Sequence, residues 1–151
     1  MDKKILRQLL KNCLVPMSDV AADIGTTRQT VAKKIELFKK SGLIKLFTIK
    51  LDPEKLGLKI RAFVLLREDP ESETKKINEN VIKEIPQVTS YYTLFGRYDA
   101  VAEVLTKDKT ELTNLVKQIR QLKGIKDTET FIIQYIVKDE LEDSLYKALE
   151  N

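Results

Sequence analysis

A polar stretch between residues 27 and 34 carries the side chains best suited to a chemical task in this sequence. It contains Thr27, Arg28, Gln29, Thr30, Lys33 and Lys34. Glutamine can form two hydrogen bonds with adenine and arginine two with guanine, while Thr30 and Ala32 are small enough to contact a thymine methyl group. Lysine ammonium groups bind backbone phosphates. The stretch therefore predicts a helix that binds double-stranded DNA.

Enzymatic chemistry has few candidate groups. The chain contains no histidine, which excludes a Ser-His-Asp triad, a Cys-His pair and every zinc site built on histidine. The single cysteine, Cys13, lies in an apolar stretch and is interpreted as a small buried hydrophobe. Asp99, Glu103 and Asp108 share one region, but no nucleophile is paired with a base and no glycine-rich phosphate loop is present. We expect no catalytic residue, no metal site and no cofactor.

Length and composition indicate a soluble globular protein. The chain has 151 residues, of which 42% are hydrophobic and 33% charged, enough for one ordinary domain or two small ones. No apolar run approaches the roughly 20 residues that a spanning helix needs, and the N-terminus lacks the apolar stretch of a secretory signal. We therefore expect a cytoplasmic protein.

Charge divides the chain into two unlike parts. Residues 1–51 carry 11 Lys and Arg against four Asp and Glu, a net charge of +7, whereas the remainder has a net charge of −3. This asymmetry favours a module that binds a polyanion, joined to a second module with another task. Lysine-rich helices that are simply solvated explain the charge equally well. The pattern of the predicted helices and strands must decide between a polyanion-binding module and helices that are simply solvated.

Three short helices are predicted in the first 43 residues. The first, over residues 2–11, places its apolar residues at helical spacing. The second begins with Ser18 as its N-cap and stops at Gly25. The third has Thr27 as its N-cap and ends at Ser41-Gly42. Its apolar stripe consists of Val31, Ile35 and Phe38.

The second and third helices fit a helix-turn-helix. Ala21 precedes the turn glycine, Gly25, by four positions, and Val31 follows it by six. If the apolar stripe of the third helix faces the core, the polar residues between 27 and 34 face outward, as in a helix that enters the major groove. A structural helical hairpin with a basic solvent face is the alternative. Residues 1–43 are therefore predicted to be a helix-turn-helix domain of winged-helix-like type that binds DNA.

A hinge is predicted over residues 44–59. Phe47, Ile49 and Leu51 alternate with polar residues, which indicates a half-buried strand over residues 44–51. Asp52-Pro53 ends this strand, and the following segment with Gly57 is the candidate domain boundary. The remaining residues, 60–151, form the second predicted domain.

The second domain shows a strand-helix-strand arrangement twice. The first unit has a strand over 60–66, a helix capped by Ser72 with apolar residues at Ile77, Val81 and Ile85, and a strand over 88–95. The second unit has strands over 100–105 and 128–137. Its helix starts at a capping box made by Asp108 and Glu111 and ends at Gly124, and a short helix over 140–149 follows the last strand.

A βαββαβ order predicts a ferredoxin-like sandwich, so the whole chain is assigned to the α+β class. Both helices then cover one face of a four-stranded antiparallel sheet and leave the other face open. The open face would expose an apolar patch larger than soluble monomers usually tolerate. We therefore expect two chains to pack through this face. Such a homodimer would also place two DNA-binding helices about 34 Å apart, the spacing of successive major grooves.

The sequence resembles the Lrp/AsnC family of feast-or-famine transcription regulators over essentially its whole length. Asp2-Lys-Lys-Ile-Leu6 is similar to the opening of that family, and residues 18–35 occupy its helix-turn-helix. Gly42-Leu-Ile-Lys45, followed by 51–57, is similar to its hinge strand. In the second domain, two short motifs match the family's Gly-x-x-Asp turn and Thr-x-Thr: Gly96-Arg-Tyr-Asp99 and Thr128-Glu-Thr130.

This resemblance implies a C-terminal RAM domain that dimerises, assembles dimers into tetramers or octamers, and often binds a free amino acid between dimers. Asp99 would then pair with the ammonium group of the ligand, backbone N–H groups of Gly96, Arg97 and Tyr98 would hold its carboxylate, and Thr128 and Thr130 would supply hydroxyls. In the plainer interpretation, Gly96 only allows a tight turn, Asp99 only caps a strand, and the two threonines are ordinary strand residues.

Three departures from the family pattern concern function. Gly25-Thr-Thr27 stands where Gly-Leu-Ser is common, and Lys33-Lys34 stands where arginines are usual, which changes base preference because lysine lacks the bidentate fork of arginine. Arg97 places a positive charge inside the effector turn.

The predicted function is a sequence-specific transcription regulator modulated by a small metabolite. An architectural DNA-binding protein of weak specificity, without an effector, is the first alternative. An RNA-binding domain is the second, since the RRM fold is also βαββαβ, yet Arg61-Ala-Phe-Val64 is only a fragment of its signature.

Overall fold

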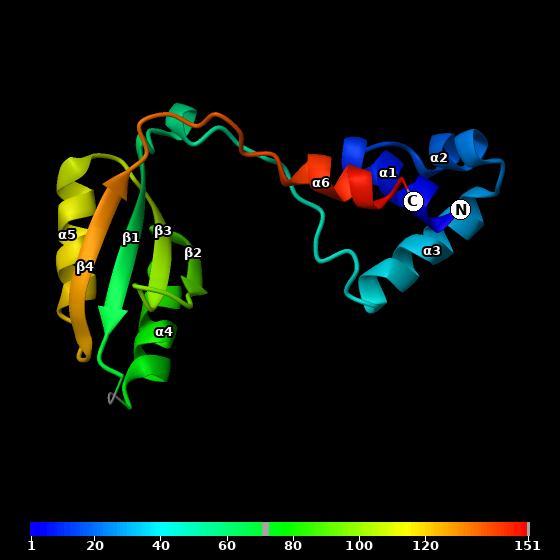
Figure 1. Ribbon diagram of the computed structural model, residues 1–151. Helices are drawn as coiled ribbons and strands as arrows, with labels where there is room; N and C mark the ends of the chain where they lie inside the picture. Colours follow the sequence, from blue (N-terminus) through cyan, green and yellow to red (C-terminus); the bar gives the residue numbers. More distant parts are fainter. Residues whose placement is uncertain (71–72, 151) are drawn as a thin grey trace. The chain divides into compact units, whose positions relative to one another are not determined.

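A computed structural model describes residues 1–70 and 73–150 of the chain. The chain forms two compact units, the first from Met1–Lys50 together with the segment that begins at Val137, and the second from Leu51–Ile136. The chain therefore passes from one unit to the other twice, as Figure 1 shows by its colours. Our predicted boundary assigned residues 60–151 to one domain, whereas the last segment groups with the N-terminal helices.

Within the described residues, the first unit contains the helices α1 (Asp2–Lys11), α2 (Met17–Ile24), α3 (Arg28–Lys40) and α6 (Leu141–Ala148). The predicted helices at the N-terminus are confirmed, and their buried residues form one core made of Ile5, Val20, Ala21, Val31, Ile35 and Phe38. Gly25 ends α2 with φ +70°, in the left-handed region that favours glycine, and thereby turns the chain tightly into α3.

The N-cap predicted for α2 is wrong. Pro16 occupies the N-cap position, and its carbonyl accepts hydrogen bonds from the N–H groups of Asp19 and Val20. The Ser18 hydroxyl instead donates to the carboxylate of Asp19 at 3.0 Å. Ser18 lies inside the first turn because proline, which fixes its own φ near −65°, takes the N-cap position two residues earlier.

Helix α6 packs against α1 within the first unit. The Tyr146 hydroxyl donates to the carbonyl of Arg7 at 3.2 Å, and the Arg7 guanidinium lies 4.0 Å from the carboxylate of Glu150. The Lys50 ammonium donates to the carbonyl of Asp139 at 2.6 Å, which holds the segment before α6 near the end of the hinge. These contacts explain why the C-terminal residues group with the N-terminal helices.

The strand predicted over residues 44–51 is absent from the described structure. Phe47, Ile49 and Leu51 are 45%, 68% and 59% exposed rather than half-buried on one side. A strand needs a neighbouring strand for its backbone hydrogen bonds, and the described part of the chain places none beside this segment. The 3₁₀-helix η1 (Glu54–Leu56) follows before the second unit begins its sheet.

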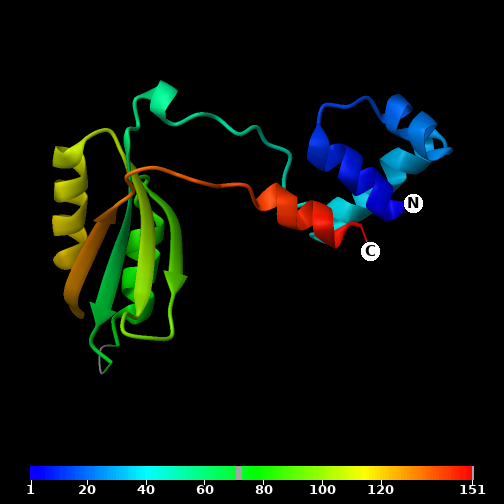
Figure 2. The same ribbon diagram turned by 45° about the horizontal axis from the view of Figure 1, so that its top comes forward.

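The second unit is the predicted ferredoxin-like sandwich. Its four strands are β1 (Ile60–Glu68), β2 (Val88–Thr93), β3 (Ala100–Thr106) and β4 (Ile125–Ile132). They form an antiparallel sheet in the order β2-β3-β1-β4. Its helices are α4 (Lys75–Lys83) and α5 (Lys109–Arg120). Figure 2 shows both helices beside the sheet, and their shared core confirms that they cover one face.

Several strand ends differ from prediction, most of all those of β4 and β2. Strand β4 begins at Ile125 and ends at Ile132, rather than spanning 128–137, because β1 extends to Glu68 and pairs with Ile125. Strand β2 ends at Thr93 rather than at residue 95. The helix-facing core of the sheet comes from alternate residues of β1 and β3, and it packs on Ile82 and Ile85 as well as on α5.

The apolar stripe predicted for α4 is partly wrong. Ile77 and Val81 are 61% and 40% exposed, whereas Asn78 and Ile82 are buried. Asn78 tolerates a core position because its amide donates to the carbonyl of Lys123 at 2.8 Å. The predicted cap, Ser72, lies outside the described residues.

The capping box of α5 is confirmed. The carboxylate of Asp108 accepts from the N–H of Glu111 at 2.8 Å, and the side chain of Glu111 reaches back to the N–H of Lys107 at 2.7 Å. One N–H group that the first turn would leave without a partner is therefore satisfied, and so is the N–H of the residue just before the N-cap.

Candidate nucleic-acid interface and effector loop

Helix α3 presents a polar side to solvent. Its N-cap is Thr27, whose hydroxyl oxygen accepts from the N–H of Thr30 at 3.2 Å. The side chains of Arg28, Gln29 and Lys33 are exposed, and no hydrogen bond or ion pair with another described residue holds them. Since the opposite side of the helix is buried in the core, these three side chains are free to contact an external partner.

Lys34 occupies a different environment from its neighbour. Its ammonium lies 3.1 Å from the carboxylate of Asp2, at the start of α1, and its side chain is 33% exposed. The structure thus places Lys34 on the side of α3 that faces α1, away from the free polar side. Because thirty-two positions separate the two residues, no local sequence pattern indicates this ion pair.

Sequence reasoning also missed an apolar residue on the exposed side of α3. Leu37 is 49% exposed, four positions after Lys33 and eight after Gln29. The helical spacing from Gln29 was the signal that could have found it. A leucine at this place can contact a thymine methyl group, in addition to the hydrogen bonds that Gln29 and Arg28 can form.

The loop between β2 and β3 holds the four residues of the predicted effector turn. Asp99 is fixed by hydrogen bonds at the strand end: its carboxylate accepts from the N–H of Glu68 at 2.8 Å, and its own N–H donates to the carbonyl of Leu66 at 2.9 Å. Its carbonyl accepts from the N–H of Leu94 at 2.8 Å. Asp99 therefore caps the start of β3, which agrees with the plainer interpretation, and one of its carboxylate oxygens is hydrogen-bonded.

Gly96 and Arg97 in this turn are exposed, whereas Tyr98 is partly buried. The Tyr98 hydroxyl donates to the carboxylate of Glu129 on β4, and the Arg97 guanidinium lies 5.7 Å from the centre of the Tyr98 ring. Gly96 has φ +157°, and a Cβ built on it would meet nothing within 4 Å. The turn therefore carries a positive charge stacked on an aromatic ring.

The two predicted threonine ligands lie on the helix-bearing face of the sheet. Thr128 and Thr130 are opposite Leu66 and Val64, whose side chains belong to the core under the helices. Glu129, between them, points to the other face, since side chains alternate along a strand. The described structure thus brings Tyr98 together with Glu129, and does not bring Tyr98 together with the threonine hydroxyls.

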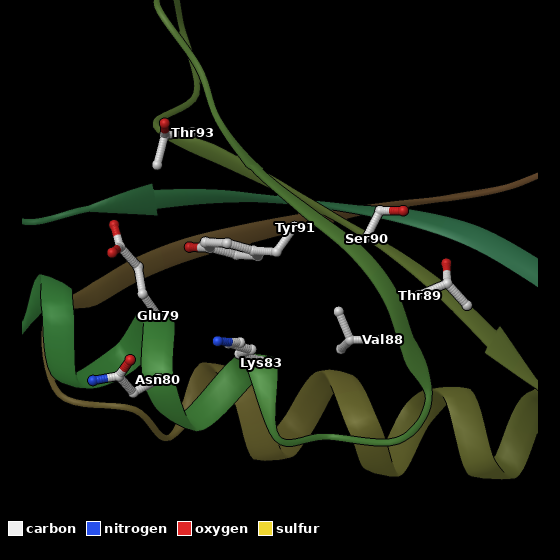
Figure 3. A pocket seen from close by; sticks show the side chains of 8 residues that line it. All are labelled: Glu79, Asn80, Lys83, Val88, Thr89, Ser90, Tyr91 and Thr93. Carbon is white, nitrogen blue, oxygen red and sulfur yellow. The ribbon is translucent and has the colours of Figure 1, made fainter. Parts of the chain in front are cut away.

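A cavity of about 610 Å³ lies between α4 and the edge strand β2. None of the residues predicted for a site lines it. Its lining, drawn in Figure 3, consists of Glu79, Asn80, Lys83, Val88, Thr89, Ser90, Tyr91 and Thr93. The Tyr91 hydroxyl points toward the Glu79 carboxylate in this view.

Comparison with known proteins gives both units a counterpart. A family model described as the Lrp/AsnC ligand binding domain matches residues 61–142, and one described as a winged helix-turn-helix DNA-binding domain matches residues 1–45. The chain belongs to the Lrp/AsnC family. Members of the Lrp/AsnC family are transcriptional regulators that bind DNA, not enzymes.

Individual Lrp/AsnC proteins are similar over nearly the full length. The HTH-type transcriptional regulator FL11 of Pyrococcus furiosus is 30% identical over 141 residues, which cover 93% of this chain and 92% of that protein. The crystal structure of an AsnC family transcriptional regulator from Agrobacterium tumefaciens is 26% identical, with a TM-score of 0.85 and coverage of 93% and 92%.

A more distant structure shares the fold. The transcriptional regulator of Neisseria meningitidis in complex with L-Met is 17% identical, with a TM-score of 0.87 and coverage of 93% of this chain and 92% of that one. The α+β architecture predicted from the sequence is thus confirmed as that of Lrp/AsnC proteins. Among the described residues, no helix is long and apolar enough to cross a bilayer.

Proposed function

We propose that this Lrp/AsnC regulator recognises specific DNA sequences through the exposed side of α3. The observation that carries the proposal is that Arg28, Gln29 and Lys33 share the solvent side of this helix and are held by no other described residue. Arg28 and Gln29 would contact base edges, whereas Lys33 would contact phosphates. Thr27 and Thr30 fix the start of the helix, where base contacts are made in helix-turn-helix proteins.

The alternative is an architectural protein of weak specificity. Such proteins bind mainly through phosphate contacts and DNA deformation, so they need basic side chains but no base-reading groups. Exposed arginine and glutamine side chains at the start of α3 favour specific recognition instead. Competition with random DNA at fixed salt separates the two: specific recognition requires at least about a thousandfold preference for the selected site.

The regulator acts as a homodimer through the open face of the sheet. Phe63 on β1 lies directly opposite Phe131 on β4, and the two rings are 39% and 50% exposed. Tyr92, on the edge strand, is 57% exposed, and Arg61 pairs with Glu103 on the same face. A second copy would cover this surface. Two such dimers, or four, would form the tetramer or octamer that the family resemblance implies.

An amino acid or a similar metabolite modulates the assembly. In this proposal Asp99 binds the ligand ammonium with its second carboxylate oxygen, and the backbone of Gly96, Arg97 and Tyr98 holds the carboxylate. Thr128 and Thr130 supply hydroxyls, and the Thr128 hydroxyl oxygen is buried without a hydrogen-bond partner among the described residues. The Neisseria meningitidis relative in complex with L-Met supports a ligand of this class.

Two experiments test these proposals. Light scattering after size-exclusion chromatography should give at least twice the monomer mass of 17.4 kDa. A thermal-shift screen against the twenty amino acids should reveal a ligand, because one at about 100 times its dissociation constant stabilises the folded state by about 2.7 kcal/mol. A monomer would overturn the dimer, and twenty flat melting curves would overturn the amino-acid effector. Either result leaves DNA binding to be judged separately.

A further inference from the structure

Buried polar atoms without a hydrogen-bond partner gather on the helix-bearing face of the sheet. Within the described residues they are both carboxylate oxygens of Glu68, the hydroxyl of Tyr91 and the hydroxyl of Thr128. The side chain of Glu68 is only 7% exposed. Buried groups of this kind are normally paired, so each one requires an explanation.

Glu68 and Tyr91 face a common space. Tyr91 on β2 is opposite Ala102 of the neighbouring strand β3, and Glu68 ends β1 on the far side of the same strand. The side chains of β3 between them are those of Ala100 and Ala102. Because alanine side chains are short, the carboxyl of Glu68 and the hydroxyl of Tyr91 can interact with each other across β3.

The charges around this space are mostly negative. Burial raises the pKa of the Glu68 carboxyl; the Lys75 ammonium opposes this shift, while Asp99 and Glu79 add to it. Burial, and next the negative charge of Glu68, also raises the pKa of the Tyr91 hydroxyl. The Lys75 ammonium lies 3.8 Å from Glu68, beyond hydrogen-bond distance. The space therefore attracts a positively charged group that donates hydrogen bonds.

Tyr91 links these buried groups to the cavity between α4 and β2. Tyr91 both interacts with Glu68 and lines the cavity, and Glu79 stands on the α4 wall beside the Tyr91 hydroxyl (Figure 3). Lys83 lines the same wall one helical turn later. Glutamate and lysine at this spacing often pair, yet the described structure shows no ion pair between them. Both charges are therefore free for a ligand.

We propose that the cavity between α4 and β2 binds a small organic cation, a primary amine whose ammonium group donates hydrogen bonds to Glu79 and Tyr91 and is also attracted by the negative charge of nearby Glu68. Val88 and the Tyr91 ring supply apolar contact for a short aliphatic chain. A bare metal ion suits the site less, because no group of three metal-ligating side chains converges within the described residues. The lining of this cavity includes no residue of α3 or of the turn at Gly96–Asp99, and the proposal does not depend on the function proposed above.

Nuclear magnetic resonance of the ¹⁵N-labelled full-length protein tests the proposal with propylammonium as the probe. 1-Propanol, of similar shape but uncharged, and sodium chloride at the same ionic strength are the controls. We expect saturable shifts of the amide signals of Tyr91 and Glu79 with propylammonium alone, with a dissociation constant of about 1 mM for a ligand of this size. Absence of saturation, or equal shifts with sodium chloride, overturns the proposal, since water or a proton then satisfies these groups.

Variants locate the binding. Glu79→Gln and Tyr91→Phe should each weaken propylammonium binding about tenfold or more, whereas Glu84→Gln, at the exposed C-cap of α4 and outside the cavity lining, should leave it unchanged. Equal affinity in Glu79→Gln and in the unmodified protein contradicts the assignment. DNA affinity should be unchanged in Glu79→Gln, so the result for this cavity remains distinguishable from the result for the α3 interface.

Discussion

The ammonium of Lys34 lies 3.1 Å from the carboxylate of Asp2 and joins α3 to the first residue of α1. The adjacent Lys33 is exposed and has no partner among the described residues. The two consecutive lysines therefore differ: Lys34 pairs with a residue of the same unit, whereas Lys33 is available to contact an external partner. Asp2 also lies at the positive end of the α1 dipole, which favours its negative charge.

Lys33→Ala should weaken binding to every DNA sequence, because it removes a phosphate contact. The slope of log affinity against log salt concentration should become shallower by about one for each bound subunit. Lys34→Ala is the matched control. Its ion pair with Asp2 is partly exposed and contributes at most about 1 kcal/mol to folding, so its salt slope should match that of the unmodified protein. Equal loss of slope in both variants would assign both lysines to phosphates.

Arg28→Ala or Gln29→Ala should change which sequence is preferred. Each bidentate contact with a base discriminates by about 1–3 kcal/mol, so one position of the selected site should become tolerant of other bases. Selection from a random duplex library before and after substitution measures this change, with Lys33→Ala as the control that retains the preference. A uniform loss of affinity without any change of preference would remove Arg28 and Gln29 from base recognition.

Thr27→Ala should destabilise the first unit by about 1 kcal/mol, because its hydroxyl oxygen no longer accepts from the N–H of Thr30. Thr27→Ser, which keeps the hydroxyl, should lose much less. Urea unfolding followed by circular dichroism measures both variants. Equal stability of the alanine and serine variants would show that the cap contributes nothing to folding.

Phe131→Glu should dissociate the dimer, because it buries a charge in an apolar interface opposite Phe63. Light scattering should then report the monomer mass, and DNA affinity should fall since two linked α3 helices no longer act together. Ile77→Glu is the control: Ile77 is 61% exposed on α4, on the covered side of the same sheet. The dimer assignment fails if both variants keep the mass of the unmodified protein.

Glu68→Gln should change the pH dependence of folding stability. Burial raises the pKa of Glu68 above its ordinary value of 4.5, so above that pH the folded protein holds this proton longer than the unfolded chain does. Stability then falls as pH rises from 4.5 until the folded-state pKa is passed. The glutamine variant should lack this fall. Urea unfolding between pH 4 and pH 8 checks the prediction, with Glu84→Gln as control, and parallel curves for both variants would contradict it.

Local patterns predicted the elements that depend on local physics. The stripe of Val31, Ile35 and Phe38 located α3, and the pair of Asp108 and Glu111 located the start of α5. The order of elements then sufficed to predict the sandwich, because few topologies accommodate two repeated strand-helix-strand units. The interpretation of Asp99 as the end of a strand also agrees with its hydrogen bond from the N–H of Glu68.

Features that depend on distant residues escaped prediction. Asn78 is buried because of a carbonyl 45 positions away, and periodicity counts asparagine as a surface residue. The hinge strand over residues 44–51 was predicted from alternation alone, although a strand also requires a neighbour. Glu68 and Tyr91 come near each other only after three strands assemble, so no window of the sequence contains this pair.

The DNA-binding unit is built from both ends of the chain, with connections at Lys50 to Leu51 and at Ile136 to Val137. Because two connections rather than one join the units, a single proteolytic cut in either connection leaves the units attached. A fragment that ends at Lys50 would lack α6 and therefore the hydrogen bond from Tyr146 to the Arg7 carbonyl on α1, so this unit cannot be isolated by simple truncation.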